Sequence, residues 1–120
     1  VFDQLGAGDI LFIDSSHVAK TGSDVNYLYF EVLPRLQAGV RVHIHDIFLP
    51  EEYPREWVVD ENRSWNEQYV VRALLMFTTG FRVIFGCNYA SKRFPDLVRA
   101  ALSDTADDTM SGGSLWIERV

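Results

Sequence analysis

The sequence predicts an α/β fold in which strands and helices alternate around one sheet. Three observations support this class. Short apolar segments alternate with longer segments of helical periodicity, and glycines stand at most of the junctions. The first two apolar segments are joined by a connection long enough for a crossover helix, which is typical of parallel strands. The chain has 120 residues, of which 48% are hydrophobic, and this suits a single domain, residues 1–120, with one core.

Four segments are predicted to be strands. The first is continuously apolar, which indicates burial on both faces of a sheet. The second alternates more and directs Val40, Val42 and Ile44 to one face. Glycines introduce the third and the fourth. The predicted bounds are 9–13, 40–44, 81–85 and 114–118.

Three helices are predicted between these strands. The first carries an apolar stripe, and Pro34 within it is expected to kink or shorten the last turn. The start of the second is marked by Ser64 and Glu67, which have the spacing of a capping box. The third begins near Pro95 and is shorter. The three stripes are Val25, Leu28, Tyr29, Val32 and Leu36; Val70, Ala73, Leu74 and Phe77; and Leu97, Val98, Ala101 and Leu102.

Composition excludes several classes of function. The formal net charge is −6 and the basic residues are scattered singly, so we expect no nucleic-acid partner. The apolar runs are far shorter than the roughly 20 residues of a membrane-spanning helix, so we expect no membrane partner. The lone Cys87 has no partner for a disulfide within the chain and suits a reducing cytoplasm. We interpret Cys87 as a structural thiol rather than a nucleophile.

Polar side chains follow the first two predicted strands. Asp14 and His17 follow the first strand, and His45 and Asp46 follow the second. The carboxyl ends of neighbouring parallel strands meet at one edge of a sheet, so we expect Asp14 and Asp46 to converge there with His17 and His45 beside them. Oxygen donors with an imidazole suit Mg²⁺ or Mn²⁺. The alternative is that these acids only cap turns.

Two neighbouring residues receive weaker interpretations. Ser15 or Ser16 as a hydrolase nucleophile lacks the flanking glycines of a nucleophile elbow. We expect His43 to point away from His45, towards a helix or solvent.

Three runs of sequence carry a family resemblance: Gly8-Asp9-Ile10-Leu11-Phe12-Ile13-Asp14-Ser15-Ser16-His17, Leu33-Pro34-Arg35-Leu36-Gln37-Ala38-Gly39-Val40 and His43-Ile44-His45-Asp46-Ile47-Phe48. They resemble class I S-adenosylmethionine-dependent methyltransferases, in the branch of metal-dependent small-molecule and sugar O-methyltransferases. The ending Gly112-Gly113-Ser114-Leu115-Trp116-Ile117 resembles the last strand of that family. The resemblance implies a partial Rossmann-like sheet of about four strands with flanking helices, in which the last strand is antiparallel.

The resemblance also implies roles for individual residues. Asp14 and Asp46 match metal ligands, and His45 stands where the family has an acid, which gives a metal set of Asp14, His45 and Asp46. His17 matches a general base that takes a proton from the substrate hydroxyl. Asp14 and Ser15 would lie beside S-adenosylmethionine. In the long aromatic stretch 48–62, Tyr53 and Trp57 would stack on the substrate, with plain surface packing as the alternative.

The glycine-rich turn and the acidic residue with which the family binds S-adenosylmethionine have no counterpart in these 120 residues. We therefore expect the chain to correspond to the carboxyl-terminal half of a methyltransferase and to be inactive alone. The alternative is a non-catalytic module that self-associates. In either case the first strand is expected to be an exposed sheet edge through which a homodimer forms.

Overall fold

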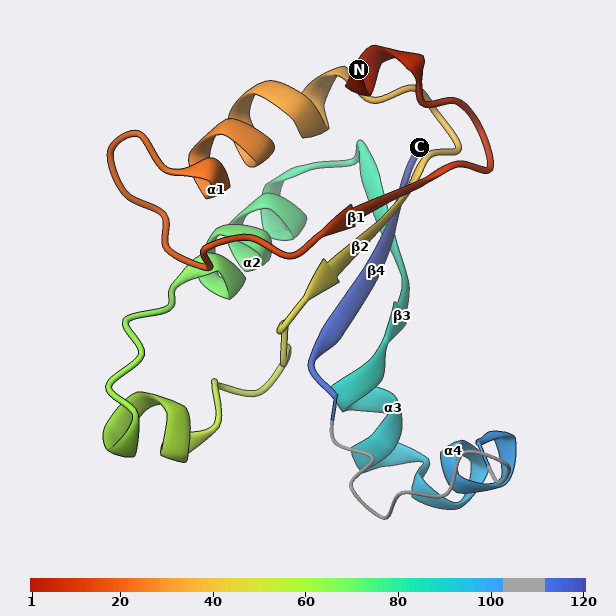
Figure 1. The fold of residues 1–120 in the computed structure, drawn as a ribbon. Helices are drawn as coiled ribbons and strands as arrows, with labels where there is room; N and C mark the ends of the chain where they lie inside the picture. Colours follow the sequence, from red (N-terminus) through yellow and green to blue (C-terminus); the bar gives the residue numbers. More distant parts are fainter. Residues whose placement is uncertain (103–111) are drawn as a thin grey trace.

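The computed structural model describes residues 1–102 and 112–120. Its centre is a mixed sheet of four strands, in the order β1-β2-β4-β3 (Figure 1). β1 and β2 are parallel, whereas β4 lies antiparallel between β2 and β3. The predicted α/β class, the four strands and the antiparallel last strand are confirmed. The strands are β1 (Ile10–Ile13), β2 (Arg41–His45), β3 (Phe81–Gly86) and β4 (Ser114–Arg119).

In the described part of the chain, four α-helices accompany the sheet. α1 and α2 lie on one side of it, and α3 and α4 extend from one end (Figure 1). α1 continues through a π-helical turn, Leu28–Val32, and ends in a 3-10 turn, Leu33–Arg35, that contains Pro34. None of the helices in the described ranges is long and apolar enough to cross a membrane. The helices are α1 (Asp24–Tyr27), α2 (Glu67–Phe77), α3 (Cys87–Arg93) and α4 (Pro95–Ala101).

The core lies between the sheet and the first two helices. Tyr29 and Val32, from the first predicted stripe, are buried there with Val71 of α2. The strands contribute the side chains that alternate towards this side. They are Leu11, Ile13, Val42, Ile44, Leu115 and Ile117.

No segment of the described residues covers the opposite side of the sheet. Ile10 is 52% exposed and Phe12 is 60% exposed, so the prediction that β1 is buried on both faces is wrong. Phe12 stacks on His43, with ring centroids 4.5 Å apart, and Trp116 meets the same imidazole edge-on. The apolar run in β1 thus supplies Leu11 and Ile13 to the core, and Phe12 to a row of rings on the open face that His43 and Trp116 complete.

The buried stripe of α2 also differs from the prediction. Val71 is fully buried, but Ala73 is exposed and Phe77 is 86% exposed. The predicted capping box is absent, since Asn66 is the residue that precedes the helix and no side chain caps it. The carboxylate of Glu67 is engaged in the interior instead, as described below.

Candidate functional site

The site is built on the loop that follows β1. His17 is only 5% exposed and has a left-handed backbone conformation, with φ of 57°. Its carbonyl accepts hydrogen bonds from the backbone N–H groups of Asn66 and Glu67, at 2.9 and 3.2 Å. These N–H groups stand at the start of α2, where a helix has no partners of its own for them. The amino end of α2 therefore holds the backbone of His17.

A second clamp holds the same loop from α1. The backbone N–H of Ser16 donates to Asp24 at 2.8 Å, and the hydroxyl of Ser16 donates to the other carboxylate oxygen. These bonds, led by the one from the hydroxyl, lower the pKa of Asp24 below its usual value. Asp24 is the first residue of α1, so the loop is tied to both helices that cover the sheet.

Glu67 lies at the centre of a buried hydrogen-bond network. Its carboxyl group is fully buried and has three partners: the Ser15 hydroxyl at 2.7 Å, Nδ1 of His17 at 2.8 Å and the Tyr29 hydroxyl at 2.9 Å. The Ser15 hydroxyl also accepts the backbone N–H of His17 at 2.9 Å. Buried carboxyl groups are costly unless they are hydrogen-bonded in this way.

Sequence reasoning missed the role of Glu67 because it was interpreted as a capping residue. A signal was present. Glu67, Val71 and Leu74 have the i, i+4, i+7 spacing of one helix face, so the acid falls on an apolar stripe. An acid at such a position needs partners inside the protein.

The predicted convergence at the carboxyl ends of β1 and β2 is confirmed. Nε2 of His17 lies 3.4 Å from a carboxylate oxygen of Asp14 and 3.7 Å from one of Asp46. Nε2 of His45 lies 3.6 Å from the other oxygen of Asp46. The carboxylate of Asp14 is about half exposed, at 54%, so the solvent side of this group is open to a ligand.

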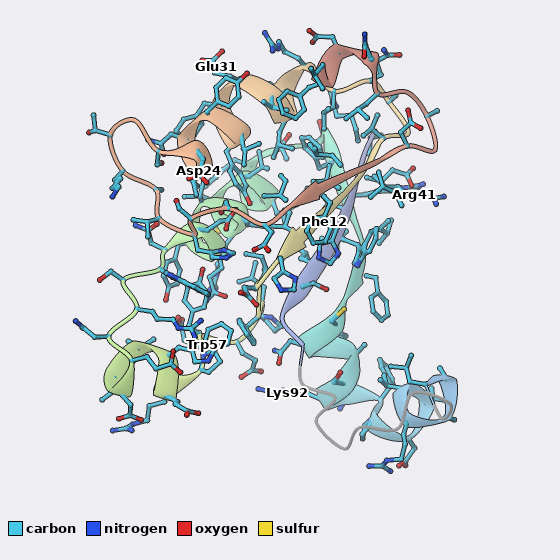
Figure 2. All side chains as sticks on the ribbon, in the orientation of Figure 1. Phe12, Asp24, Glu31, Arg41, Trp57 and Lys92 are labelled. Atoms are coloured by element: carbon cyan, nitrogen blue, oxygen red, sulfur yellow. The ribbon has the colours of Figure 1, made fainter. Side chains whose placement is uncertain are left out.

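The expectation that His43 points away from His45 is wrong, although its ring does lie on the open, solvent side of the sheet. Residues two apart in a strand point to the same face, and Nε2 of His43 lies 3.4 Å from Nδ1 of His45. Burial and the neighbouring His45 lower the pKa of His43. Both rings belong to the open face of the sheet, on the side from which Arg41 projects (Figure 2).

The predicted metal set was tested against this arrangement. Within residues 1–102 and 112–120, no group of three or more His, Cys, Asp or Glu side chains is arranged to hold a metal ion. The side chains of Asp14 and Asp46 both approach the imidazole of His17, while His45 approaches Asp46 alone. As arranged, Asp14, His45 and Asp46 therefore do not fit a metal ion.

The segment predicted to cover the substrate forms an aromatic cluster. Tyr53 is buried, and its hydroxyl accepts the backbone N–H of Gln68 at 3.1 Å. One face of Trp57 is covered by the guanidinium of Arg63, 4.2 Å from the ring centre. Trp57, whose position Figure 2 shows, meets Phe48 edge-on at 5.2 Å. Little of either predicted ring is left free, and their contact with a substrate stays a prediction.

Cys87 begins α3 and is half-buried. Its sulfur accepts a hydrogen bond from the Ser114 hydroxyl at 2.8 Å. This environment agrees with the interpretation of Cys87 as a structural thiol.

The chain matches no protein family model, no curated protein and no solved structure. Function is therefore inferred from the geometry of the site, together with the sequence resemblance.

Proposed function

We propose that this chain carries the acceptor side of an S-adenosylmethionine-dependent O-methyltransferase, in which His17 is the general base for a hydroxyl of a small molecule or sugar. One observation carries the proposal. The Nε2 atom of His17 lies beside Asp14 and Asp46 at the carboxyl ends of two parallel strands, the edge where α/β sheets bind their ligands.

The proposed reaction requires one proton transfer from the substrate hydroxyl to a residue of this chain. S-adenosylmethionine, when bound, supplies a methyl group on a positively charged sulfur. As the bond between the substrate oxygen and the methyl carbon forms and the sulfur–methyl bond breaks, the hydroxyl proton goes to Nε2 of His17. Asp14 and Asp46 are close enough to stabilise the imidazolium that results.

Two further features support the proposal. The last strand is antiparallel, as the resemblance implies. Asp14 presents a half-exposed carboxylate that suits a positively charged cofactor.

The predicted cofactor contact of Ser15 is less favoured, since its hydroxyl already donates to Glu67. From the lone Cys87 thiol we also infer a cytoplasmic location.

The first experiment is calorimetric titration of the chain with S-adenosylmethionine, with and without Mg²⁺ or Mn²⁺, after its size in solution has been measured. Saturable one-to-one binding is expected if the chain forms the cofactor side as well. Methyl transfer to small hydroxyl compounds and sugars is then assayed with the protein encoded by the complete reading frame.

Variants of two histidines test the proposed base. His17→Asn is expected to lower kcat by about 10²- to 10⁴-fold, the usual contribution of a general base. His43→Asn is the matched control, since the ring of His43 packs on Phe12 and Trp116 on the open face of the sheet. Full activity of His17→Asn would refute the proposal.

A second candidate function, self-association, is favoured by the open face of the sheet. Ile10, Phe12 and Phe85 are each more than half exposed there. Charges flank this apolar row: Arg41 and Arg82, both paired with Glu118, lie at one end, and Asp14 lies at the other. Two copies packed face to face in opposite directions would pair the basic end of one with the acidic end of the other.

Sedimentation tests this second candidate directly. The chain is expected to sediment as a dimer, and Phe12→Lys is expected to yield monomers. Phe77→Lys, on the exposed side of α2, is the control and should leave the dimer intact. If the wild-type chain were monomeric at micromolar concentration, self-association would be excluded.

A further inference from the structure

We propose that Glu67 is a positioning residue which, held by Tyr29 and Ser15, keeps His17 in the tautomer with hydrogen on Nδ1 and the lone pair on Nε2. The catalytic use of this tautomer rests on the function proposed above. The tautomer itself follows from the hydrogen bonds.

The first step is to assign the donors around Glu67. Ser15 has a single hydroxyl hydrogen, and its oxygen already accepts the N–H of His17, so the hydrogen is directed to Glu67 at 2.7 Å. The Tyr29 hydroxyl, 2.9 Å from the other carboxyl oxygen, also donates. Burial and the nearby Glu67 carboxylate raise the pKa of Tyr29, so this phenol keeps its proton at neutral pH.

The second step concerns Nδ1 of His17. Both carboxyl oxygens of Glu67 already accept a hydrogen bond, and an ionised carboxylate has no hydrogen to donate. The 2.8 Å contact between Glu67 and Nδ1 is therefore satisfied only when Nδ1 carries the hydrogen. Three donors compensate the buried charge of Glu67, which has no contact with water.

The third step is the consequence at the other ring nitrogen. In a neutral imidazole with hydrogen on Nδ1, Nε2 has a lone pair, and here it faces the oxygens of Asp14 and Asp46 at 3.4 and 3.7 Å. Nε2 and the carboxylates of Asp14 and Asp46 are then three hydrogen-bond acceptors that face one point at the edge of the sheet. A substrate hydroxyl at this point would find Nε2 ready to take its proton. Glu67 acts through His17 and does not touch the substrate.

The test uses nuclear magnetic resonance on the wild-type chain with ¹⁵N-labelled histidine, at a pH where the ring is neutral. Long-range proton–nitrogen correlations of the ring distinguish the two tautomers, and His43→Asn and His45→Asn assign the three rings. We expect a protonated Nδ1 and an unprotonated Nε2 for His17. The opposite tautomer, which a protonated Glu67 donating to Nδ1 would produce, would overturn the proposal.

Variants test the supporting residues. Tyr29→Phe removes one donor and is expected to lower kcat by about tenfold, the usual effect of losing a hydrogen bond to a charged group. The same change is expected to increase the minor tautomer of His17. Tyr69→Phe is the matched control, since the hydroxyl of Tyr69 donates to Glu52 on the surface. If Tyr29→Phe altered neither kcat nor the tautomer, its part in the proposal would be refuted.

Glu67→Gln provides a stronger test, because an amide presents an acceptor or a donor to Nδ1 and should give a mixture of tautomers. If Glu67→Gln does not fold, the wild-type spectrum still decides the question. The two proposals fail separately. The expected tautomer together with no methyl transfer by the protein of the complete reading frame would disprove the function and leave the positioning role of Glu67 intact.

Discussion

The indole of Trp65 lies against the imidazole of His17, with ring centroids 4.1 Å apart and ring planes tilted by 37°. Trp65 also meets Trp57 edge-on at 5.2 Å, and the guanidinium of Arg63 lies 4.6 Å from the Trp65 ring. The aromatic cluster thus begins at His17 and continues into the segment predicted to cover the substrate. Trp65 is the ring in that cluster that can fix the tilt of the imidazole.

Replacing Trp65 tests this contact. In Trp65→Leu the ring protons of His17 should lose the upfield shift that a neighbouring indole causes, because no aromatic ring then lies over the imidazole. The measurement is a proton spectrum of the histidine rings. Trp57→Leu is the control, since Trp57 lies one ring further away, and it should leave the His17 signals nearly unchanged.

The clamp between Ser16 and Asp24 predicts that the stability of the folded chain falls at acid pH. The pKa of Asp24 is lowered in the folded chain, so the stabilisation is fully present above the usual value near 3.8 and is lost as the pH falls through the lowered value. Ser16→Ala should raise the pKa of Asp24 towards 3.8, and a carbon-detected titration of the carboxyl group measures it. An unchanged pKa in Ser16→Ala would contradict the role of this hydroxyl.

Alanine substitutions at two adjacent glycines before β4 are expected to have very different effects on the free energy of unfolding. A Cβ atom on Gly113 would lie 2.6 to 2.9 Å from atoms of the buried Phe48 ring, whereas one on Gly112 would meet no atom of residues 1–102 or 112–120 within 4 Å. Gly113→Ala should lower the free energy of unfolding by about 1–3 kcal/mol, the usual cost of overpacking. Gly112→Ala should be nearly neutral. Urea denaturation measures the free energy of unfolding of both variants, and equal values would contradict the prediction.

The corrected face of α2 leads to a fourth prediction. Val71→Ala should cost about 2 kcal/mol of stability, because the side chain is fully buried. Phe77→Ala removes a larger side chain that is 86% exposed, and it should change stability by less than about 0.5 kcal/mol. Thermal unfolding of the two variants provides the comparison, and the reverse order would support the stripe predicted from the sequence.

The arrangement of Asp14, His45 and Asp46 predicts the effect of a chelator. Because these side chains do not form a three-ligand group as they stand, methyl transfer should continue in EDTA at close to the untreated rate. The rate is measured before and after dialysis against the chelator. Loss of activity that Mn²⁺ restores would show that the side chains rearrange around an ion.

Much of the fold could be predicted because strand signals are local. Apolar segments bounded by glycines identify all four strands to within about a residue at each end, and the stripe from Val25 to Leu36 identifies the first crossover. The helix Cys87–Arg93 was missed, because it follows β3 without a turn and carries only a weak apolar stripe. Which face of β1 is covered depends on the rest of the sheet, and its sequence alone does not reveal this.

The candidate site could be predicted only in part. The convergence of Asp14 and Asp46 follows from the general geometry of parallel strands, so it was within reach. The network around Glu67 depends on side chains brought together from the loop after β1, the π-helical turn that follows α1, and α2, and pairings between distant segments have no local signature in a single sequence.

The two attachments of His17 to α2 have a consequence for how the chain folds. Its carbonyl and its ring both bond to the first turn of a helix that lies 50 positions further along the chain. Closing so large a loop costs entropy that only the completed core repays, so the site should appear late and all at once during folding. The Asn66 amide should then exchange its hydrogen with solvent only through global unfolding, at the slow rate of the most protected amides in the sheet.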